Sequence, residues 1–362
     1  MKDKLTILCI LGPMLLFCIL GIIKPADELS LEERRKLEQV PNFSVESILN
    51  NSYFSKWTDY LTDQFPYRTF FRQLKGTVSL NLFQKIEENN VIQIDNSLYE
   101  LNPTINEDSI NHFTELLQET LDKYNHSSHV YYSIIPDKIY YVDDSQIPKL
   151  DYEKLVSQVQ TAFQNYSYIS LFEELNKDSY YQTDIHWKQS ALQDVVQKLK
   201  TEMQLPTSNY SWTKQEVTPF YGALKSRIPN NIKAETITYY TNDIIEEASV
   251  FNYEHQQFEK VYQKENIHHL DGYDVFLSGA SPLLFIENKM ATTNRELIVF
   301  RDSFASSLLP LFIPDYQKIT VIDLRYITSD YLENLEEINW QDTTDILLLY
   351  SIPIINNSFT LK

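Results

Sequence analysis

From about residue 108 to its end, the chain alternates between helical and strand-like patterns of hydrophobic residues. Apolar residues recur at helical spacing in 112–124, 152–163, 187–203, 304–312 and 329–338. Continuous apolar runs of strand length occupy 130–135, 168–171, 296–300, 319–323 and 345–350. Strands that are apolar throughout and alternate with helices are typical of a parallel sheet covered on both faces. The pattern therefore predicts an α/β fold with a mostly parallel sheet.

Two regions depart from this alternation. Residues 206–290 contain strand-like pieces, such as 235–240 and 249–253, without strong helices, which predicts a β-rich insertion. Residues 48–82 carry apolar residues at helical spacing on both sides of Pro66, which predicts two helices with no evident chemistry.

The N-terminus carries the longest uncharged run. Residues 5–23 give 19 positions without charge after Lys2 and Lys4, about the length that a bilayer requires. We expect a transmembrane signal anchor at 1–24, a tether at 25–44 and one domain at 45–362. Both cysteines, Cys9 and Cys18, lie in this run, so the remainder is free of thiols. A domain without thiols suits an oxidising exterior. We therefore expect a single-pass membrane protein with its bulk outside the cytoplasm.

Composition excludes several functions. A formal charge of −19 over 362 residues argues against nucleic acid and against anionic lipid headgroups as partners, since both bind clustered Lys and Arg. Six glycines leave no Gly-rich phosphate loop, so P-loop and dinucleotide cofactors are not expected. The 25 tyrosines and four tryptophans offer flat faces that could stack on sugars, although most are expected in the core.

Ser303 follows the apolar run 296–300 and precedes a predicted helix. That context places its hydroxyl at the carboxyl end of a strand, where the backbone N–H groups of Ser303 and Phe304 could hold an oxyanion. Ligands bind at this edge of an open α/β sheet, and Asp137 or Lys138, Arg325 and Tyr350 also follow strands.

Asp184 and His186 are two residues apart, so an extended backbone would turn both side chains to one pocket. A histidine so placed can accept a proton from Ser303 while the carboxylate orients the imidazole. One alternative is that Asp184 only caps a helix beside a surface histidine. Another is that Asp302 only caps the following helix and Ser303 only satisfies a backbone amide. A metal site would need a second cluster, for which 268–271 is the candidate, and none is predicted.

These residues carry a family resemblance. Thr183-Asp184-Ile185-His186-Trp187 and Arg301-Asp302-Ser303-Phe304-Ala305 resemble the motifs of the DHHW family of bacterial surface proteins, which is similar to the SGNH-hydrolase-like alginate O-acetyltransferases. Further matching pieces are 63–68, 220–222, 273–277 and 321–326, so the likeness covers about residues 45–355.

The resemblance implies a three-layer α/β/α SGNH-hydrolase-like fold with a catalytic triad of Ser303, His186 and Asp184. It also implies that Arg325 and Tyr350 orient the acyl group or the acceptor. Relatives of this kind esterify polysaccharide hydroxyls outside the membrane, with acetyl groups supplied by a membrane-bound O-acyltransferase.

The chain departs from the family pattern in three places. Ile185 replaces a histidine, and Arg301 replaces the glycine before the Asp-Ser pair, which would place a cation beside the nucleophile. Ala280 stands where a side-chain oxyanion donor is expected. We therefore predict an O-acetyltransferase without a cofactor or metal, and keep two alternatives: an acetylesterase, and a non-catalytic carbohydrate-binding or assembly component.

Overall fold

The computed structural model describes residues 2–81, 87–125, 128–206, 210–228, 231–291, 293–341 and 343–362. The chain divides into two compact units. Unit 1 comprises Met1–Asn89 and Lys225–Lys233, and unit 2 comprises Asn90–Leu224 and Ala234–Lys362.

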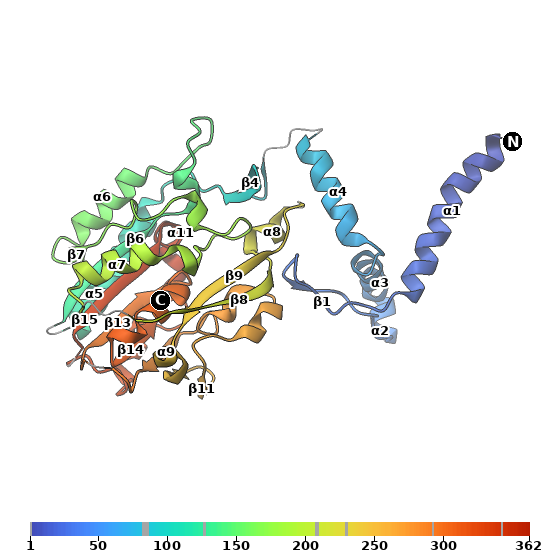
Figure 1. Ribbon diagram of the computed structural model, residues 1–362. Coiled ribbons are helices and arrows are strands. Elements are labelled where there is room, and N and C mark those ends of the chain that lie inside the picture. The colour runs from blue at the N-terminus through green and yellow to red at the C-terminus, as the bar shows by residue number, and fades with distance from the viewer. Residues whose placement is uncertain are drawn as a thin grey trace. The chain divides into compact units, whose positions relative to one another are not determined.

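An eight-stranded mixed sheet forms the centre of unit 2, with the strand order β11-β10-β12-β14-β13-β15-β6-β7 (Figure 1). Five strands are parallel: β14 (Lys318–Ile322), β13 (Glu296–Arg301), β15 (Asp345–Ser351), β6 (His129–Ile135) and β7 (Ser167–Tyr168). The large, mostly parallel sheet predicted from the apolar runs is therefore confirmed.

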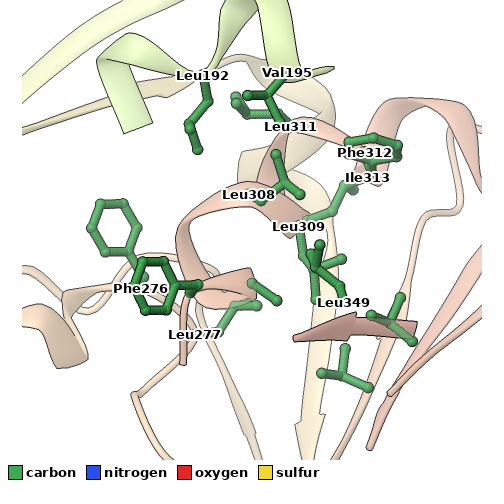
Figure 2. Packing of buried hydrophobic residues seen from close by; sticks show 14 of the residues in the cluster. Leu192, Val195, Phe276, Leu277, Leu308, Leu309, Leu311, Phe312, Ile313 and Leu349 are labelled. Carbon is green, nitrogen blue, oxygen red and sulfur yellow. The ribbon is translucent and has the colours of Figure 1, made fainter. Parts of the chain in front are cut away.

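Helices cover both faces of this sheet because neighbouring residues of each strand point to opposite sides. On β13, Leu297 and Val299 pack in one core with α7 (Gln193–Glu202) and α10 (Ala305–Leu308). Ile298 and Phe300 pack in a second core with α5 (Glu107–Tyr124), α6 (Tyr152–Ala162) and α11 (Ile352–Ile355). Figure 2 shows the first core, where Leu308 and Leu309 lie among Leu192, Val195 and Leu349. These layers hold the end of β13 rigidly.

Two predicted helices are shorter than the sequence pattern suggested. The stretch 304–312 forms only the four-residue α10, followed by 3-10 turns at Leu309–Leu311 and Ile313–Asp315. Pro310 and Pro314 lie in the first turn of these pieces, where proline fits but an interior helical hydrogen bond cannot form. The stretch 329–338 forms a 3-10 helix at Ser329–Asn334 rather than an α-helix.

The β-rich region 206–290 is not a separate body. Strands β10 (Ser249–Asn252), β11 (Gln257–Glu259) and β12 (Leu283–Glu287) extend the main sheet as antiparallel strands. Strands β8 (Thr213–Phe220) and β9 (Glu235–Thr241) of this region pair with each other. Earlier in the chain, and outside this region, β4 (Val91–Ile94) pairs with β5 (Ser97–Glu100). Short helices α8 (Ala223–Arg227) and α9 (Asp243–Glu247) complete this region.

Unit 1 is mainly helical. It contains α1 (Lys2–Ile23), α2 (Val45–Leu49), α3 (Ser52–Asp63) and α4 (Arg68–Asn81), with a two-stranded pairing of β1 (Leu29–Ser30) and β2 (Arg35–Lys36). The predicted break at Pro66 falls between α3 and α4. Among the residues whose side chains are described, no helix meets the length and apolarity needed to cross a membrane.

Candidate functional site

Asp184 and His186 lie in a tight loop that closes on itself. The loop is pinned by an antiparallel bridge between Tyr180 and Trp187 and by a hydrogen bond from the Tyr181 N–H to the His186 carbonyl. The backbone is bent rather than extended as the sequence argument assumed. The two side chains nevertheless meet, because Asp184 Oδ1 accepts a hydrogen bond from the His186 backbone N–H at 2.9 Å.

The structure brings Asp184, His186 and Ser303 into one hydrogen-bonded line. His186 Nδ1 lies 2.5 Å from Asp184 Oδ1, and His186 Nε2 lies 2.8 Å from Ser303 Oγ. Because a carboxylate accepts only, Nδ1 carries the hydrogen and Nε2 is free to accept the serine proton. Asp184 and His186 are buried, while Ser303 is half-buried. This geometry can deprotonate a serine for nucleophilic attack.

Asp184 is held in its charged form. Burial alone would raise the pKa of its carboxyl group, but the electrostatic interaction with the His186 imidazole and hydrogen bonds from His186 and from the Ala223 N–H outweigh burial. The pKa of Asp184 therefore lies well below its ordinary value. The Ala223 N–H donates to Asp184 Oδ2 at 2.6 Å, so both carboxylate oxygens are engaged.

The loop that carries Asp184 is anchored by two charged residues far away in the sequence. Glu235 accepts hydrogen bonds from the N–H groups of Gln182 and Thr183 at 2.7 and 2.8 Å, and from the Thr183 hydroxyl at 2.7 Å. Lys138 Nζ donates to the carbonyl groups of Leu98, Tyr181 and Gln182, which uses all three of its N–H bonds. Lys138 thus has a positioning role, and burial lowers its pKa to about 7.

His186 is stacked on a second aromatic ring. The centroids of the His186 imidazole and the Tyr273 ring are 4.0 Å apart, with an interplanar angle of 8°. The Tyr273 hydroxyl donates to Ser307 Oγ at 2.8 Å, and the Trp187 indole N–H lies 3.0 Å from the same oxygen and 2.9 Å from the Phe304 carbonyl. The sequence argument missed Tyr273 and Trp187, although both stand in the segments that resemble the DHHW family.

Ser303 lies two residues after the end of β13 and two residues before α10, between a strand and a helix as predicted. Asp302, which is buried, accepts a hydrogen bond from the Phe304 N–H at 3.0 Å and another from the Ser351 N–H at 2.7 Å. The Phe304 N–H, which was expected to hold an oxyanion, thus donates to Asp302 in this structure. The Ser303 N–H has no hydrogen-bond partner among the described residues.

Arg301 does not present a cation beside the nucleophile. Its side chain is fully buried, and its guanidinium group donates to Ser306 Oγ at 2.8 Å and to the Gly279 carbonyl at 3.2 Å. Its Nε lies 3.8 Å from an oxygen of Asp323. Arg301 thus ties the end of β13 to α10 and to the Gly279 turn, which replaces the predicted electrostatic role with a structural one.

Arg325 and Tyr350 lie in different surroundings. Arg325 grips Asp323 through Nε at 2.9 Å and one terminal nitrogen at 2.6 Å, while its other terminal nitrogen, Nη1, is unbonded among the described residues. Tyr350 is buried in the second core with its ring against Phe113. Its hydroxyl has no partner among the described residues, and burial raises its pKa well above the ordinary value. The predicted pocket position of Tyr350 is therefore a core position.

A small cleft of about 20 Å³ lies beside the site, lined in part by Asp137, Lys138, Ile185 and Phe304. Burial raises the pKa of Asp137 to about 6, although a hydrogen bond from the Tyr152 hydroxyl opposes the shift. No group of three His, Cys, Asp or Glu side chains is arranged as a metal site in the described parts of the chain, and 268–271 does not form one.

Solved structures share this fold. A DHHW family protein from Eubacterium siraeum is 18% identical, with a TM-score of 0.62 over 76% of this chain and 95% of that one. PatB1 from Bacillus cereus is 16% identical, with a TM-score of 0.55 over 73% and 96%. Its structure with a sulfonyl adduct gives 17% identity and a TM-score of 0.56, over 73% of this chain and 95% of that one. The resemblance to the DHHW family is thus confirmed at the level of the fold. No protein-family model and no curated protein matches the sequence.

Proposed function

We propose that the chain is a serine O-acetyltransferase that acts on hydroxyl groups of a cell-surface or exported polysaccharide. The observation that carries this proposal is the 2.8 Å contact between Ser303 Oγ and His186 Nε2, with Asp184 on the far nitrogen of the imidazole. Serine, histidine and carboxylate in this order perform acyl transfer on several unrelated folds.

In the first half-reaction, Ser303 Oγ attacks the carbonyl carbon of an acetyl donor and passes its proton to His186 Nε2. The tetrahedral intermediate then collapses, and the leaving oxygen of the donor takes that proton as the bond to the acyl carbon breaks. Asp184 stabilises the imidazolium form during the transfer. The products are acetyl-Ser303 and the deacylated donor.

In the second half-reaction, a sugar hydroxyl gives its proton to His186 and attacks the acetyl carbonyl carbon. The bond to Ser303 Oγ breaks, and Ser303 recovers a proton from His186. The acetylated sugar leaves, and the enzyme returns to its starting state.

The negative charge on the intermediate requires donors that are not already in use. The Ser303 N–H meets this condition, and Nη1 of Arg325 is the candidate for a second donor. Each such donor typically contributes about 10²–10³ in rate. Arg325 would then keep the substrate-orienting role expected from the family resemblance, while its pairing with Asp323 fixes the direction of the guanidinium.

The proposal includes a cellular setting. Residues 1–24 would act as an uncleaved signal anchor and 25–44 as a tether, with the remainder of the chain outside the cytoplasm. The acetyl donor would come from a membrane-bound O-acyltransferase, as the resemblance implies. PatB1, which shares the fold, has been solved with a sulfonyl adduct. Sulfonyl reagents are therefore suitable probes of Ser303.

A non-catalytic carbohydrate-binding role is the second candidate. It is favoured by the engagement of the Phe304 N–H with Asp302 and by Ala280 in place of a side-chain donor, which leave few groups for an oxyanion. An acetylesterase would use the same triad with water as the acceptor.

Incubation of the full-length protein in detergent with 4-nitrophenyl acetate and an oligosaccharide tests the three functions together. A transferase forms acetylated oligosaccharide, an esterase releases only acetate, and a binding component turns over no faster than its Ser303→Ala variant. Absence of acetylated sugar across hexose, N-acetylhexosamine and uronate oligomers, with rapid acetate release, would overturn the transferase proposal in favour of the esterase.

A further inference from the structure

Unit 1 exposes many large apolar side chains and buries several charged ones. Most of the exposed large hydrophobic side chains of the described chain belong to it, although it is much the smaller unit. On α3, Phe54 is 58% exposed and Leu61 is 60% exposed, and on α4, Phe70 is 58% exposed. Together with Phe65, Phe71 and Leu74, these residues form what we call the apolar face of α3–α4. A soluble unit of this size would ordinarily turn such residues inward.

Several charged residues of unit 1 pair with one another in its interior. Asp63 accepts two hydrogen bonds from Arg35, at 2.5 and 2.7 Å, and a third from the Glu38 N–H at 2.9 Å. Glu33 pairs with Arg68 and with Arg72, the latter at 2.8 Å. The side chains of Asp63 and Glu33 are each only 8% exposed.

Gln64 completes this polar interior. It bonds the backbone of Asp27 through both ends of its amide, at 2.9 Å each, and the Glu38 carbonyl at 3.1 Å. Burial lowers the pKa of both Arg68 and Arg72. The segment 63–68 resembles the DHHW family. Its polar residues are hydrogen-bonded or ion-paired within unit 1, and its aromatic residues are exposed.

The sequence spacing explains how α3 and α4 can expose apolar residues and also contribute charged residues to the interior of the unit. Phe54 and Leu61 are two turns apart on α3, and Phe70, Phe71 and Leu74 fall on one stripe of α4. Arg68 and Arg72, four residues apart, fall on another stripe and point to Glu33. On α4 the paired stripe faces into the unit, and on α3 the last residue, Asp63, does the same.

The apolar face continues onto α1. The Phe17 ring stacks on Phe65 with centroids 5.2 Å apart and meets the edge of Phe71 at 5.7 Å. Phe17 belongs to the uncharged run 5–23 and precedes the end of α1 at Ile23 by six residues, or about 9 Å along a helix. The apolar face of α3–α4 is therefore continuous with the uncharged run of α1.

We propose that α3 and α4 lie in the headgroup region of a lipid bilayer, with their apolar face turned toward the acyl chains. The occupant of the face is lipid rather than a protein, because the face is continuous with the segment proposed as the membrane anchor. Lys56 and Lys75, on α3 and α4, are exposed, and lysine side chains of surface-lying helices can extend to lipid phosphate groups. This inference rests on the proposed membrane attachment, and it gives the enzyme a second, surface-lying contact with the bilayer beyond a single spanning helix.

Site-specific fluorescence in vesicles tests the inference. The full-length protein is reconstituted into phosphatidylcholine–phosphatidylglycerol vesicles after both native cysteines are changed to serine. A single cysteine is then introduced as Leu61→Cys or Phe70→Cys and labelled with an environment-sensitive dye. Phe258→Cys is the matched control, because Phe258 is 72% exposed and apolar but belongs to unit 2. A variant that keeps native Cys18 reports on the anchor.

We expect lipids that carry a quencher to remove most of the fluorescence at positions 61 and 70 and little at position 258. Quenching at positions 61 and 70 that is as weak as at position 258 would overturn the inference. A blue-shifted signal that the lipid-borne quencher does not reach would also overturn it, because that pattern means that protein covers the face. Quenching at Cys18 without quenching at 61 and 70 would leave the anchor standing and refute the surface contact. Lack of quenching at all sites would refute both. None of these outcomes tests the proposed activity of Ser303, so the surface contact can be refuted while the proposed acyl transfer stands.

Discussion

Gly222 and Asp184 approach each other so closely that no side chain fits between them. A Cβ atom placed on Gly222 would lie 2.5 Å from the Asp184 Cβ and 2.3 Å from the Thr183 carbonyl oxygen. This approach lets the next residue, Ala223, donate its N–H to the Asp184 carboxylate. The glycine in the segment 220–222 therefore helps to position the Asp184 carboxylate, although it lies 38 residues from Asp184 in the sequence.

Gly222→Ala should displace the Asp184 loop. The substitution forces backbone apart and weakens a hydrogen bond to a charged group, which is worth about 1.5–3 kcal/mol. We expect a loss of that order in the free energy of unfolding, together with a marked fall in ester turnover. Gly272→Ala is the control, since its nearest contact would be a milder 3.1 Å to the Phe220 ring. Equal stability and turnover in the two variants would contradict this role of Gly222.

Tyr273 should act on the rate through the orientation of His186. Tyr273→Phe keeps the stacked ring and loses only the hydrogen bond to Ser307, so turnover should fall a few-fold at most. Tyr273→Leu removes the ring that backs the imidazole, and misplacement of a catalytic group by about 1 Å can cost ~10²-fold. We expect kcat for an activated ester to fall strongly with KM nearly unchanged.

Tyr239→Leu controls for the cavity that such a change leaves, because Tyr239 is buried but outside the site. If Tyr239→Leu and Tyr273→Leu lose the same fraction of kcat, the stacking contact has no special role. A Tyr273→Phe variant as impaired as Tyr273→Leu would shift the explanation to the Ser307 hydrogen bond.

Asp137 should make the protein less stable as pH rises. Its folded-state pKa of about 6 lies above the ordinary value of 3.8, so the folded state holds the proton more tightly than the unfolded state. The associated stability is present below about pH 4 and is lost as pH rises through 6, by an amount on the order of 3 kcal/mol. Asp137→Asn cannot ionise, so its free energy of unfolding should improve relative to the parent between pH 4 and pH 7. Parallel pH curves for the two proteins would contradict the raised pKa.

The strands and the individual motifs around Asp184, His186 and Ser303 were predictable because each depends on a local pattern. Buried parallel strands such as β13 and β15 must be apolar throughout, and that composition is visible in the sequence. The pairing of Asp184 with His186 also follows from a short spacing. Placement of Ser303 at the end of a strand required only the order of the elements along the chain.

The remaining site residues depend on contacts between distant segments. Tyr273 meets His186 across 87 positions, and Glu235 meets Thr183 across 52, so no local pattern records either contact. Arg301 looked like an exposed cation, yet Ser306 and the Gly279 carbonyl satisfy it in the interior. The Phe304 N–H was expected to be free because the sequence does not show that the Asp302 side chain turns back to accept it.

The central claim is that His186 activates Ser303, and a sulfonyl fluoride tests it most directly. Mass spectrometry of the intact protein should find a single adduct, which peptide mapping places on Ser303, and none in Ser303→Ala. His186→Ala should slow the labelling by ~10³-fold or more, because an unassisted serine hydroxyl is a weak nucleophile. Labelling of the parent and both variants at the same rate, or an adduct at another residue, would contradict the account.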